Sequence, residues 1–286
     1  MPQGLALGQT LGGWELLREI GRGASSTVYL ATKAATGHTA AIKVVPLAPG
    51  PGQAAAEELF VASARAAMAL QHPGIVQLHE TGVAPGLVWQ SMEAVPGSDL
   101  GRYTRPPRLL PETLIVKLGC RLAQALAYAH QQGMVHRDVK AANVLVDWPT
   151  DTVKLTDFGI ARLTGASRTG TGIVLGTPGY MAPEQLAGAL PSVASDLYAL
   201  GVLLFELFCG RLPHEGRSMG ELLRQVALET PLALRSLRPD LPAPLSDLLA
   251  RLLAKAPQQR PANGSLLALE LQQIASDMTA AGVKSR

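Results

Sequence analysis

One short polar run near the middle of the chain combines side chains that could act on a phosphate group. It reads HRDVKAAN at residues 136–143, between a stretch with helical periodicity and an apolar run. Asp138 could accept a proton from a hydroxyl, Lys140 could neutralise phosphate, and Asn143 could hold Mg²⁺. Because a random polar loop would rarely combine these residues at this spacing, the run predicts a site for phosphate chemistry.

Two further charged residues interrupt apolar runs. Asp157 begins the triplet DFG, shortly after the run VKL at residues 153–155. A carboxylate beyond a strand end, beside a flexible glycine, is suited to hold a metal over phosphates. Lys43 lies within AIKVV at residues 41–45, where its charge needs a partner. It is either an edge residue that reaches water or a clamp for phosphate, and its position after a glycine-rich run favours the clamp.

That glycine-rich run, GRGASSTV at residues 21–28, joins the first two expected strands. Its glycines would let backbone amides approach phosphate oxygens without a side chain between them. Alone the run is a weak signal, because many glycine pairs are simply hairpin turns.

The elements that must position these residues change type along the chain. The first 95 residues or so read mostly as strands, and the pattern becomes helical after Pro96-Gly97. A small strand-rich lobe would therefore be joined to a larger helical lobe near residues 92–96, and clefts between lobes usually bind ligands. We expect strands at 14–22, 26–32, 39–46, 75–80 and 87–92, and helices at 54–70, 111–132, 192–209, 219–228, 243–254 and 263–278.

The composition favours a globular protein of 286 residues with a sizeable core, because 47% of its residues are hydrophobic. A net charge of +3 gives no reason to expect nucleic acid or a membrane surface as a partner. No signal peptide is visible, and the apolar run 197–209 is too short to span a bilayer. Cys120 and Cys209 are interpreted as reduced, buried thiols of a cytoplasmic protein, with a disulfide as the second interpretation.

These motifs, in this order, resemble the signature of eukaryotic-like (Hanks-type) bacterial serine/threonine protein kinases. The resemblance covers nearly the whole chain and includes APE at residues 182–184. It implies an α+β, bilobal protein kinase fold, with a small five-stranded N-lobe carrying one main helix and a larger, mostly helical C-lobe. The N-lobe and hinge would occupy residues 1–95 and the C-lobe residues 96–278, which leaves a short tail at 279–286.

By the same resemblance, buried polar residues would support the helical lobe. Glu184 and Arg260 would form an ion pair there, and Asp196 would brace the catalytic loop. The sequence GTPGY at residues 176–180, together with Lys140 in the catalytic loop, is typical of serine/threonine kinases rather than tyrosine kinases.

The resemblance also implies ATP and Mg²⁺ as cofactors, with Mn²⁺ as an alternative ion. Asp138 would orient the attacking hydroxyl and take its proton, and Lys43 would hold the α and β phosphates. Lys140 and Thr177 would complete the catalytic set, and Asn143 and Asp157 would bind the metal. The nucleotide would be bound by the glycine-rich run, Lys43 and the walls of the adenine pocket, namely Gly21, Arg22, Gly23, Ala24, Ser25, Ser26, Val28, Ala41, Met92, Glu93, Val95 and Leu145.

Residues 160–175 form a polar, glycine-rich segment in which related bacterial kinases phosphorylate themselves. We expect Thr169 and Thr171 to be such sites, with Thr171 the first, and Arg137 could bind a phosphothreonine. The competing interpretation is that both threonines are ordinary loop hydroxyls. The resemblance also implies a homodimer in which one copy phosphorylates the other, whereas the protein substrate cannot be read from any motif.

The sequence departs from the family at one position of the small-lobe helix. Counting back from His72-Pro73, the glutamate that pairs with the strand lysine is replaced by Ser63. On a helix, Glu58 and Glu57 lie about 140° and 240° away from Ser63, so neither simply substitutes. Three interpretations stay open. In the first, Lys43 is held by Asp157, by phosphate or by a displaced Glu58; in the second, the kinase is attenuated and needs a partner; in the third, position 63 carries an altered residue.

Two other classes of function compete with an active protein kinase. The first is a pseudokinase that binds nucleotide or partners and signals by shape, which Ser63 supports. The second is a small-molecule kinase, which generally lacks the stretch GTPGYMAPE found here at residues 176–184. We favour an active kinase, because the residues expected at the phosphates and the metal are all present.

Overall fold

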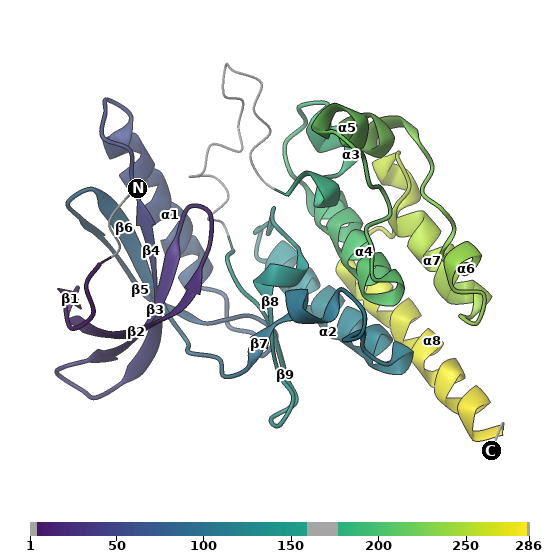
Figure 1. Cartoon of the computed structure of the whole chain (residues 1–286), viewed down its shortest axis with the longest axis horizontal. Helices are drawn as coiled ribbons and strands as arrows, with labels where there is room; N and C mark the ends of the chain where they lie inside the picture. Colours follow the sequence, from purple (N-terminus) through teal and green to yellow (C-terminus); the bar gives the residue numbers. More distant parts are fainter. Residues whose placement is uncertain (1–4, 159–176, 285–286) are drawn as a thin grey trace.

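A curled antiparallel sheet forms the first part of the chain in the computed structural model, which describes residues 5–158 and 177–284 (Figure 1). Its six strands follow the order β1-β2-β3-β4-β6-β5. Apolar side chains on one face, including Trp14, Ile42 and Trp89, form a small core of their own. The strands are β1 Thr10–Leu11, β2 Trp14–Arg22, β3 Thr27–Lys33, β4 Thr39–Pro46, β5 Leu78–Ala84 and β6 Leu87–Met92.

The sheet differs from the five predicted strands in two ways. A two-residue strand, β1, adds to the edge by pairing with β2. The strand expected at 75–80 begins only at Leu78, because the preceding residues pair elsewhere: the Val76 N–H donates to the Leu155 carbonyl at 2.8 Å, and the Leu155 N–H donates to the Gly74 carbonyl at 2.8 Å. Residues 74–76 therefore connect the sheet to the helical part.

The helix α1, Gln53–Met68, covers the other face of the sheet (Figure 1). Its buried residues Phe60, Ala64 and Ala67 recur at helical spacing and form its inner stripe. Phe60 packs against Val45 of β4 and Val88 of β6. This packing determines which side chains of β4 and β6 lie beneath the helix.

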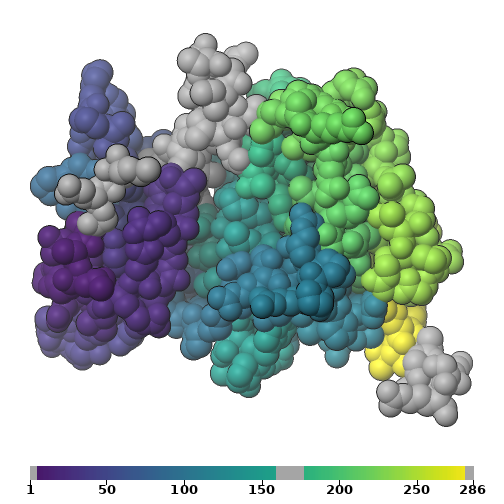
Figure 2. All heavy atoms as spheres, viewed as in Figure 1, coloured from purple at the N-terminus to yellow at the C-terminus, as the bar shows by residue number. Residues whose placement is uncertain are grey.

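The second part of the chain is helical (Figure 1) and encloses the larger core. The green and yellow atoms at the right of Figure 2 belong to this part. Its centre is the helix α4, Val193–Cys209, which is buried over nearly its whole length. The Ser192 side chain caps the start of α4, and Gly210, with φ 70°, ends it. The other helices are α2 Glu112–Gln131, α3 Pro183–Leu186, α5 Met219–Leu228, α6 Leu234–Leu237, α7 Ala243–Leu252 and α8 Gly264–Lys284, and short 3₁₀ turns occupy Leu100–Tyr103, Ala141–Asn143, Pro178–Tyr180 and Pro257–Gln259.

A three-stranded sheet lies between the two parts, and it carries the residues that flank the catalytic loop (Figure 1). It consists of β7 Ser98–Asp99, β8 Val144–Asp147 and β9 Thr152–Leu155. The predicted helices are all present, although α8 continues to Lys284, beyond the residue at which a tail was expected. The one-turn helices α3 and α6 were not predicted, because four residues are too few to show a helical period.

Both cysteines are free thiols in this structure, so the disulfide of the second interpretation is not formed. They are half-buried rather than fully buried, and burial raises the pKa of Cys209 to about 11. Within the two described ranges, no helix has both the length and the apolarity that a membrane crossing requires.

Candidate active site

The carboxylate of Asp196 holds the catalytic loop from beneath. It projects from α4, is 1% exposed, and accepts hydrogen bonds from the backbone N–H groups of His136 at 2.7 Å and Arg137 at 2.8 Å. His130 Nε2 donates a third hydrogen bond to it at 2.8 Å. Arg137 has a φ of 75°, a strained value for a residue with a side chain, and such backbone persists only where its surroundings hold it.

His136 connects this loop to the segment that contains Asp157. Its ring is fully buried, 4.4 Å from the Phe158 ring in an edge-on contact. Nδ1 accepts a hydrogen bond from the Asp138 N–H at 3.2 Å, so Nε2 carries the proton that is donated to the Thr156 carbonyl at 2.9 Å. The sequence reasoning gave His136 no role of its own, although its position between the apolar Val135 and the charged Arg137 and Asp138 was a usable signal.

Three of the predicted site residues converge on this loop. Asn143 Nδ2 donates to the Asp138 carbonyl oxygen at 2.8 Å and to Asp138 Oδ2 at 2.9 Å. Lys140 Nζ lies 2.7 Å from the same Oδ2. The Asp138 side chain nevertheless remains 31% exposed, so a carboxylate oriented by two neighbours is open to an incoming hydroxyl.

Lys43 and Asp157 join the two lobes through an ion pair. Lys43 Nζ on β4 lies 2.6 Å from Asp157 Oδ2, and the side chains are only 10% and 18% exposed. Asp157 has a φ of 70°, which marks a second strained position beside the site. Of the groups considered for holding Lys43, Asp157 is therefore the one that does so in this structure.

The oxygen donors of Asp157 and Asn143 fit a magnesium ion whose remaining ligands come from a bound phosphate chain. Both residues offer hard oxygen donors, and Nδ2 of Asn143 is engaged with Asp138, which leaves its Oδ1 for a cation. In the described part of the chain, no group of three or more His, Cys, Asp and Glu side chains could hold a metal ion. A metal at this site would need further oxygens, such as those of a phosphate chain, and Mg²⁺ is usually bound in this way.

The walls predicted for the adenine belong to one apolar cluster. Ala41 on β4 is paired with Met92 on β6, and both are buried. Val28, Val95 and Leu145 are half-buried and pack against the same core. These five residues come from β3, β4, β6, β8 and the link between the lobes, and all of them belong to or pack against the core that extends through the helical part.

Polar groups of the link between the lobes, near residues 92–96, already form contacts within the protein. The Glu93 N–H donates to the Gln77 carbonyl at 2.9 Å, and the Glu93 carboxylate pairs with Lys154 at 2.7 Å. The backbone carbonyl of Glu93 is thus the group that it can offer to an adenine edge. The ion pair with Lys154 fixes the link to β9.

The glycine-rich run forms the hairpin between β2 and β3. Gly21 pairs with Val28, and the Gly23 N–H donates to the Ser26 carbonyl at 2.8 Å. Ala24 and Ser25 lie exposed at its tip, as does Arg22, whose side chain binds Glu19 at 2.9 Å. Between Arg22 and Val28 the hairpin carries no charged side chain, so its tip at Ala24 and Ser25 presents mainly backbone.

The position of the missing glutamate lies on the inner side of α1. Ser63 is half-buried there, three residues after Phe60. Glu58 is exposed, and Glu57 accepts a hydrogen bond from Gln53 at 2.8 Å. Within the described residues, neither glutamate pairs with Lys43.

Not every predicted residue joins the cluster. Thr177 is exposed at the start of a short turn, and within residues 5–158 and 177–284 its side chain makes no hydrogen bond to Asp138 or Lys140. Thr169 and Thr171 lie outside the described residues.

Buried polar contacts support the segment after Thr177. Arg260, whose side chain is fully buried, binds Glu184 at 2.6 and 2.8 Å, which is the ion pair that the family resemblance implied. Tyr180 also donates a hydrogen bond to Glu206 of α4, and burial raises the pKa of that carboxyl group. The second contact was not predicted, although a glutamate within the apolar run at 197–209 was a signal for it.

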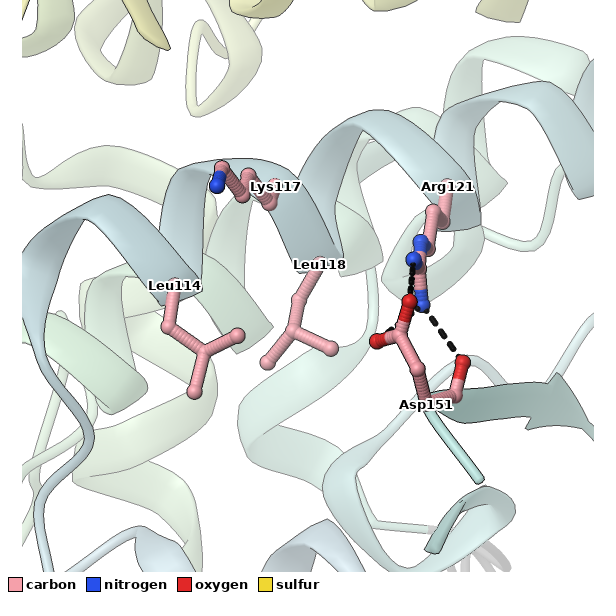
Figure 3. A pocket seen from close by; sticks show the side chains of 5 residues that line it. All are labelled: Leu114, Lys117, Leu118, Arg121 and Asp151. Atoms are coloured by element: carbon pink, nitrogen blue, oxygen red, sulfur yellow. Dashed lines mark hydrogen bonds and ion pairs between the residues drawn. The ribbon is translucent and has the colours of Figure 1, made fainter. Parts of the chain in front are cut away.

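A pocket of about 170 Å³ lies elsewhere, on the outer side of α2 (Figure 3). Arg121 binds Asp151 there, through its backbone carbonyl at 2.8 Å and its side chain at 2.9 Å. Because these charges are bound to each other, the contact connects α2 to the turn between β8 and β9. None of the predicted site residues lines this pocket, and its lining consists of Leu114, Lys117, Leu118, Arg121 and Asp151.

The family described as protein kinase domain matches residues 14–272. The chain belongs to that family. The kinase PrkC of Bacillus subtilis (strain 168) is 34% identical over 263 residues, which cover 90% of this chain and 40% of that protein. The kinase PknF of Mycobacterium tuberculosis (strain H37Rv) is 34% identical over 264 residues, which cover 90% of this chain and 55% of that protein. Both are named serine/threonine-protein kinases.

Among solved structures, the kinase domain of Mycobacterium tuberculosis PknI is 33% identical, with a TM-score of 0.76 over 95% of this kinase chain and 100% of that one. The bilobal kinase fold expected from the motifs is thereby confirmed. The similarity to PrkC and PknF places the chain among bacterial serine/threonine kinase domains, whose family uses ATP and a divalent metal ion. The chain spans only between about a third and just over half of the length of the curated relatives it matches.

Proposed function

We propose that this chain is the catalytic domain of an ATP- and Mg²⁺-dependent protein kinase that transfers the γ-phosphate to serine and threonine hydroxyls of proteins. The convergence of Lys140 and Asn143 on the Asp138 carboxylate is the observation that carries the proposal. The Lys43–Asp157 ion pair supports it, because it provides a cation from the first lobe and a metal-binding oxygen from the second.

Each polar residue of the site has a distinct task in this proposal. Asp138 orients the attacking hydroxyl and accepts its proton, while Lys140 stabilises negative charge on the transferred group. Lys43 binds the α and β phosphates, and Asn143 and Asp157 hold Mg²⁺. The bound metal supplies electrostatic stabilisation of the charge that develops on the phosphoryl oxygens.

The adenine would bind in the apolar cluster described above. The Glu93 carbonyl and the Val95 N–H would hydrogen bond to its edge, and Ala41 and Leu145 would cover its two faces with Val28 above. The burial of these side chains in one cluster supports this placement. Met92 closes the back of the pocket, and backbone amides of residues 21–26 would contact the phosphates.

We propose in addition that the kinase phosphorylates itself at Thr171 and Thr169, and that Thr177 contacts the catalytic loop in the active state. A homodimer for this reaction and a cytoplasmic location stay predictions. Peptide mass spectrometry after incubation with Mg-ATP tests the phosphosites. A segment 160–177 that stays unmodified in an active preparation would rule them out.

Transfer of labelled phosphate from γ-labelled ATP to a generic basic protein tests the proposed activity. We expect transfer by the wild type, and its loss on Asp138→Asn, which removes the proton acceptor while preserving shape. Asp247→Asn, an identical change on the exposed side of α7, is the matched control and should retain transfer. A wild type that binds ATP but transfers nothing would instead be a pseudokinase, the alternative that Ser63 supports.

A further inference from the structure

A buried carboxamide lies beside Lys43 without a partner. The Gln90 side chain is on β6, the residue is 1% exposed, and neither Nε2 nor Oε1 has a hydrogen-bond partner among the described residues. Leaving both ends of an amide unsatisfied away from water is unfavourable. Buried side-chain amides usually have partners, so this one requires a physical explanation.

The register of the sheet places Gln90 directly opposite Lys43. The two residues are Cα partners across β4 and β6. Their side chains therefore leave the same face of the sheet, and the Cβ atoms of such a pair are about 5 Å apart. Val45 and Val88, two residues further along each strand, form the next pair on this face, and both pack against Phe60 of α1. Lys43 and Gln90 thus share the space beneath α1.

The same space is where the helix lacks its carboxylate. Ser63 lies on the inner side of α1, close in sequence to the buried Phe60 and Ala64, and it carries no charge. Beneath this helix there is consequently an ammonium group without a glutamate and a carboxamide oxygen without a donor. A lysine ammonium has three N–H donors, and a glutamine Oε1 is an acceptor, so the two groups are complementary.

We propose that Gln90 is a positioning residue for Lys43 and replaces the missing helix glutamate. This inference rests on the proposed kinase function. When Asp157 turns to the metal, Lys43 Nζ donates a hydrogen bond to Gln90 Oε1 and stays directed at the phosphates. Because Gln90 is neutral, it orients the ammonium without cancelling its charge. A hydrogen bond to a charged group is stronger than one between neutral groups.

Ser91 provides a matched control on the neighbouring position. It is fully buried, and its Oγ likewise has no partner among the described residues. Ser91 is paired with Ile42, whose side chain packs in the separate cluster with Trp14 and Trp89. It therefore faces away from Lys43, and Ser91→Ala removes an unsatisfied group without affecting the proposed contact.

Steady-state kinetics and thermal unfolding of four proteins test the proposal: the wild type, Gln90→Leu, Gln90→Glu and Ser91→Ala. Gln90→Leu and Ser91→Ala should both keep or raise the melting temperature, because each removes an unsatisfied polar group from the interior. Only Gln90→Leu should lower kcat/KM for ATP, by about tenfold or more, which is the contribution of one hydrogen bond to a charged group. Gln90→Glu should retain wild-type kcat/KM or exceed it.

The loss of kcat/KM caused by Gln90→Leu should be reversed when a carboxylate is introduced on α1. Adding Ser63→Glu to Gln90→Leu should recover most of the lost kcat/KM, a response that a purely structural role of Gln90 would not give. If Gln90→Leu folds poorly, Gln90→Met, which preserves the length of the side chain, takes its place in every comparison.

A Gln90→Leu protein with wild-type kcat/KM would overturn the proposal. If the wild type transfers no phosphate, the proposed function fails. The role of Gln90 can then still be tested by measuring the affinity for Mg²⁺ in the presence of a non-hydrolysable ATP analogue. Equal affinity of the wild type and Gln90→Leu in that titration would also overturn it, whereas a tenfold weaker affinity of the variant would support it.

Discussion

The substitution Asp196→Asn tests whether the buried acid of α4 positions the catalytic loop. The carboxylate accepts three hydrogen bonds, from the N–H groups of His136 and Arg137 and from the His130 ring. Asparagine has the same shape, but only one of its two terminal atoms is an acceptor. Its NH₂ group would face at least one N–H donor, so a favourable contact becomes a repulsive one.

The expected magnitude follows from these contacts. A hydrogen bond to a charged group is worth about 1.5–3 kcal/mol, and a buried donor left without a partner adds a further penalty of about 1–3 kcal/mol. Adding one such loss to one such penalty, we expect Asp196→Asn to lower the free energy of unfolding by about 3–5 kcal/mol. The strained backbone of Arg137 also loses its support, and a displacement of Asp138 by about 1 Å would reduce kcat roughly a hundredfold.

Urea unfolding measures the first effect, and phosphate transfer under saturating ATP measures the second. Asp277→Asn, on the exposed side of α8, is the control for the same chemical change and should alter neither quantity. If Asp196→Asn lowered the stability but kept the wild-type kcat, the loop would be positioned by other contacts. An unchanged free energy of unfolding would refute the reasoning about the buried carboxylate altogether.

Three further perturbations have outcomes that the structure determines. Glu184→Ala leaves the fully buried guanidinium of Arg260 without its carboxylate, so urea unfolding should show a free energy of unfolding lower by about 3–5 kcal/mol. An unchanged free energy of unfolding would show that the pair is dispensable. Gly12→Ala would place a Cβ atom 2.1 Å from the Trp89 ring at a φ of +59°, and calorimetry should show a destabilisation of about 1–3 kcal/mol. Burial lowers the pKa of His214 from 6.5 to about 4, so the folded state resists protonation of this ring. The free energy of unfolding should therefore fall as the pH drops from about 6.5 to 4, and His214→Gln should make it less dependent on pH in this range.

Much of the site could be predicted from the sequence because its residues are held by local chain geometry. Asp138, Lys140 and Asn143 lie within one short loop, so their spacing in sequence already determines that they meet. The long helices were predictable for a related reason, since α2 and α4 each repeat apolar residues over several turns.

The contacts that sequence reasoning missed depend on long-range register. Residues 74–76 read as a strand, but their partner is Leu155, some 80 residues later, rather than β6. The position of Gln90 opposite Lys43 depends likewise on which residues of β4 and β6 are paired. A shift of one residue would turn either side chain to the other face of the sheet, and composition alone does not determine that choice.

The missing glutamate changes what controls the site. A helix carboxylate would bind Lys43 and leave Asp157 for the metal, whereas here Lys43 and Asp157 bind each other with little exposure to water. Charges so shielded attract each other more strongly than exposed ones. Loading of metal and nucleotide must therefore separate this pair, and a neutral acceptor such as Gln90 lowers the cost of doing so without competing with the phosphates for the lysine charge. Because α1 carries no charged partner for Lys43, rotation of that helix would act on the lysine only through packing.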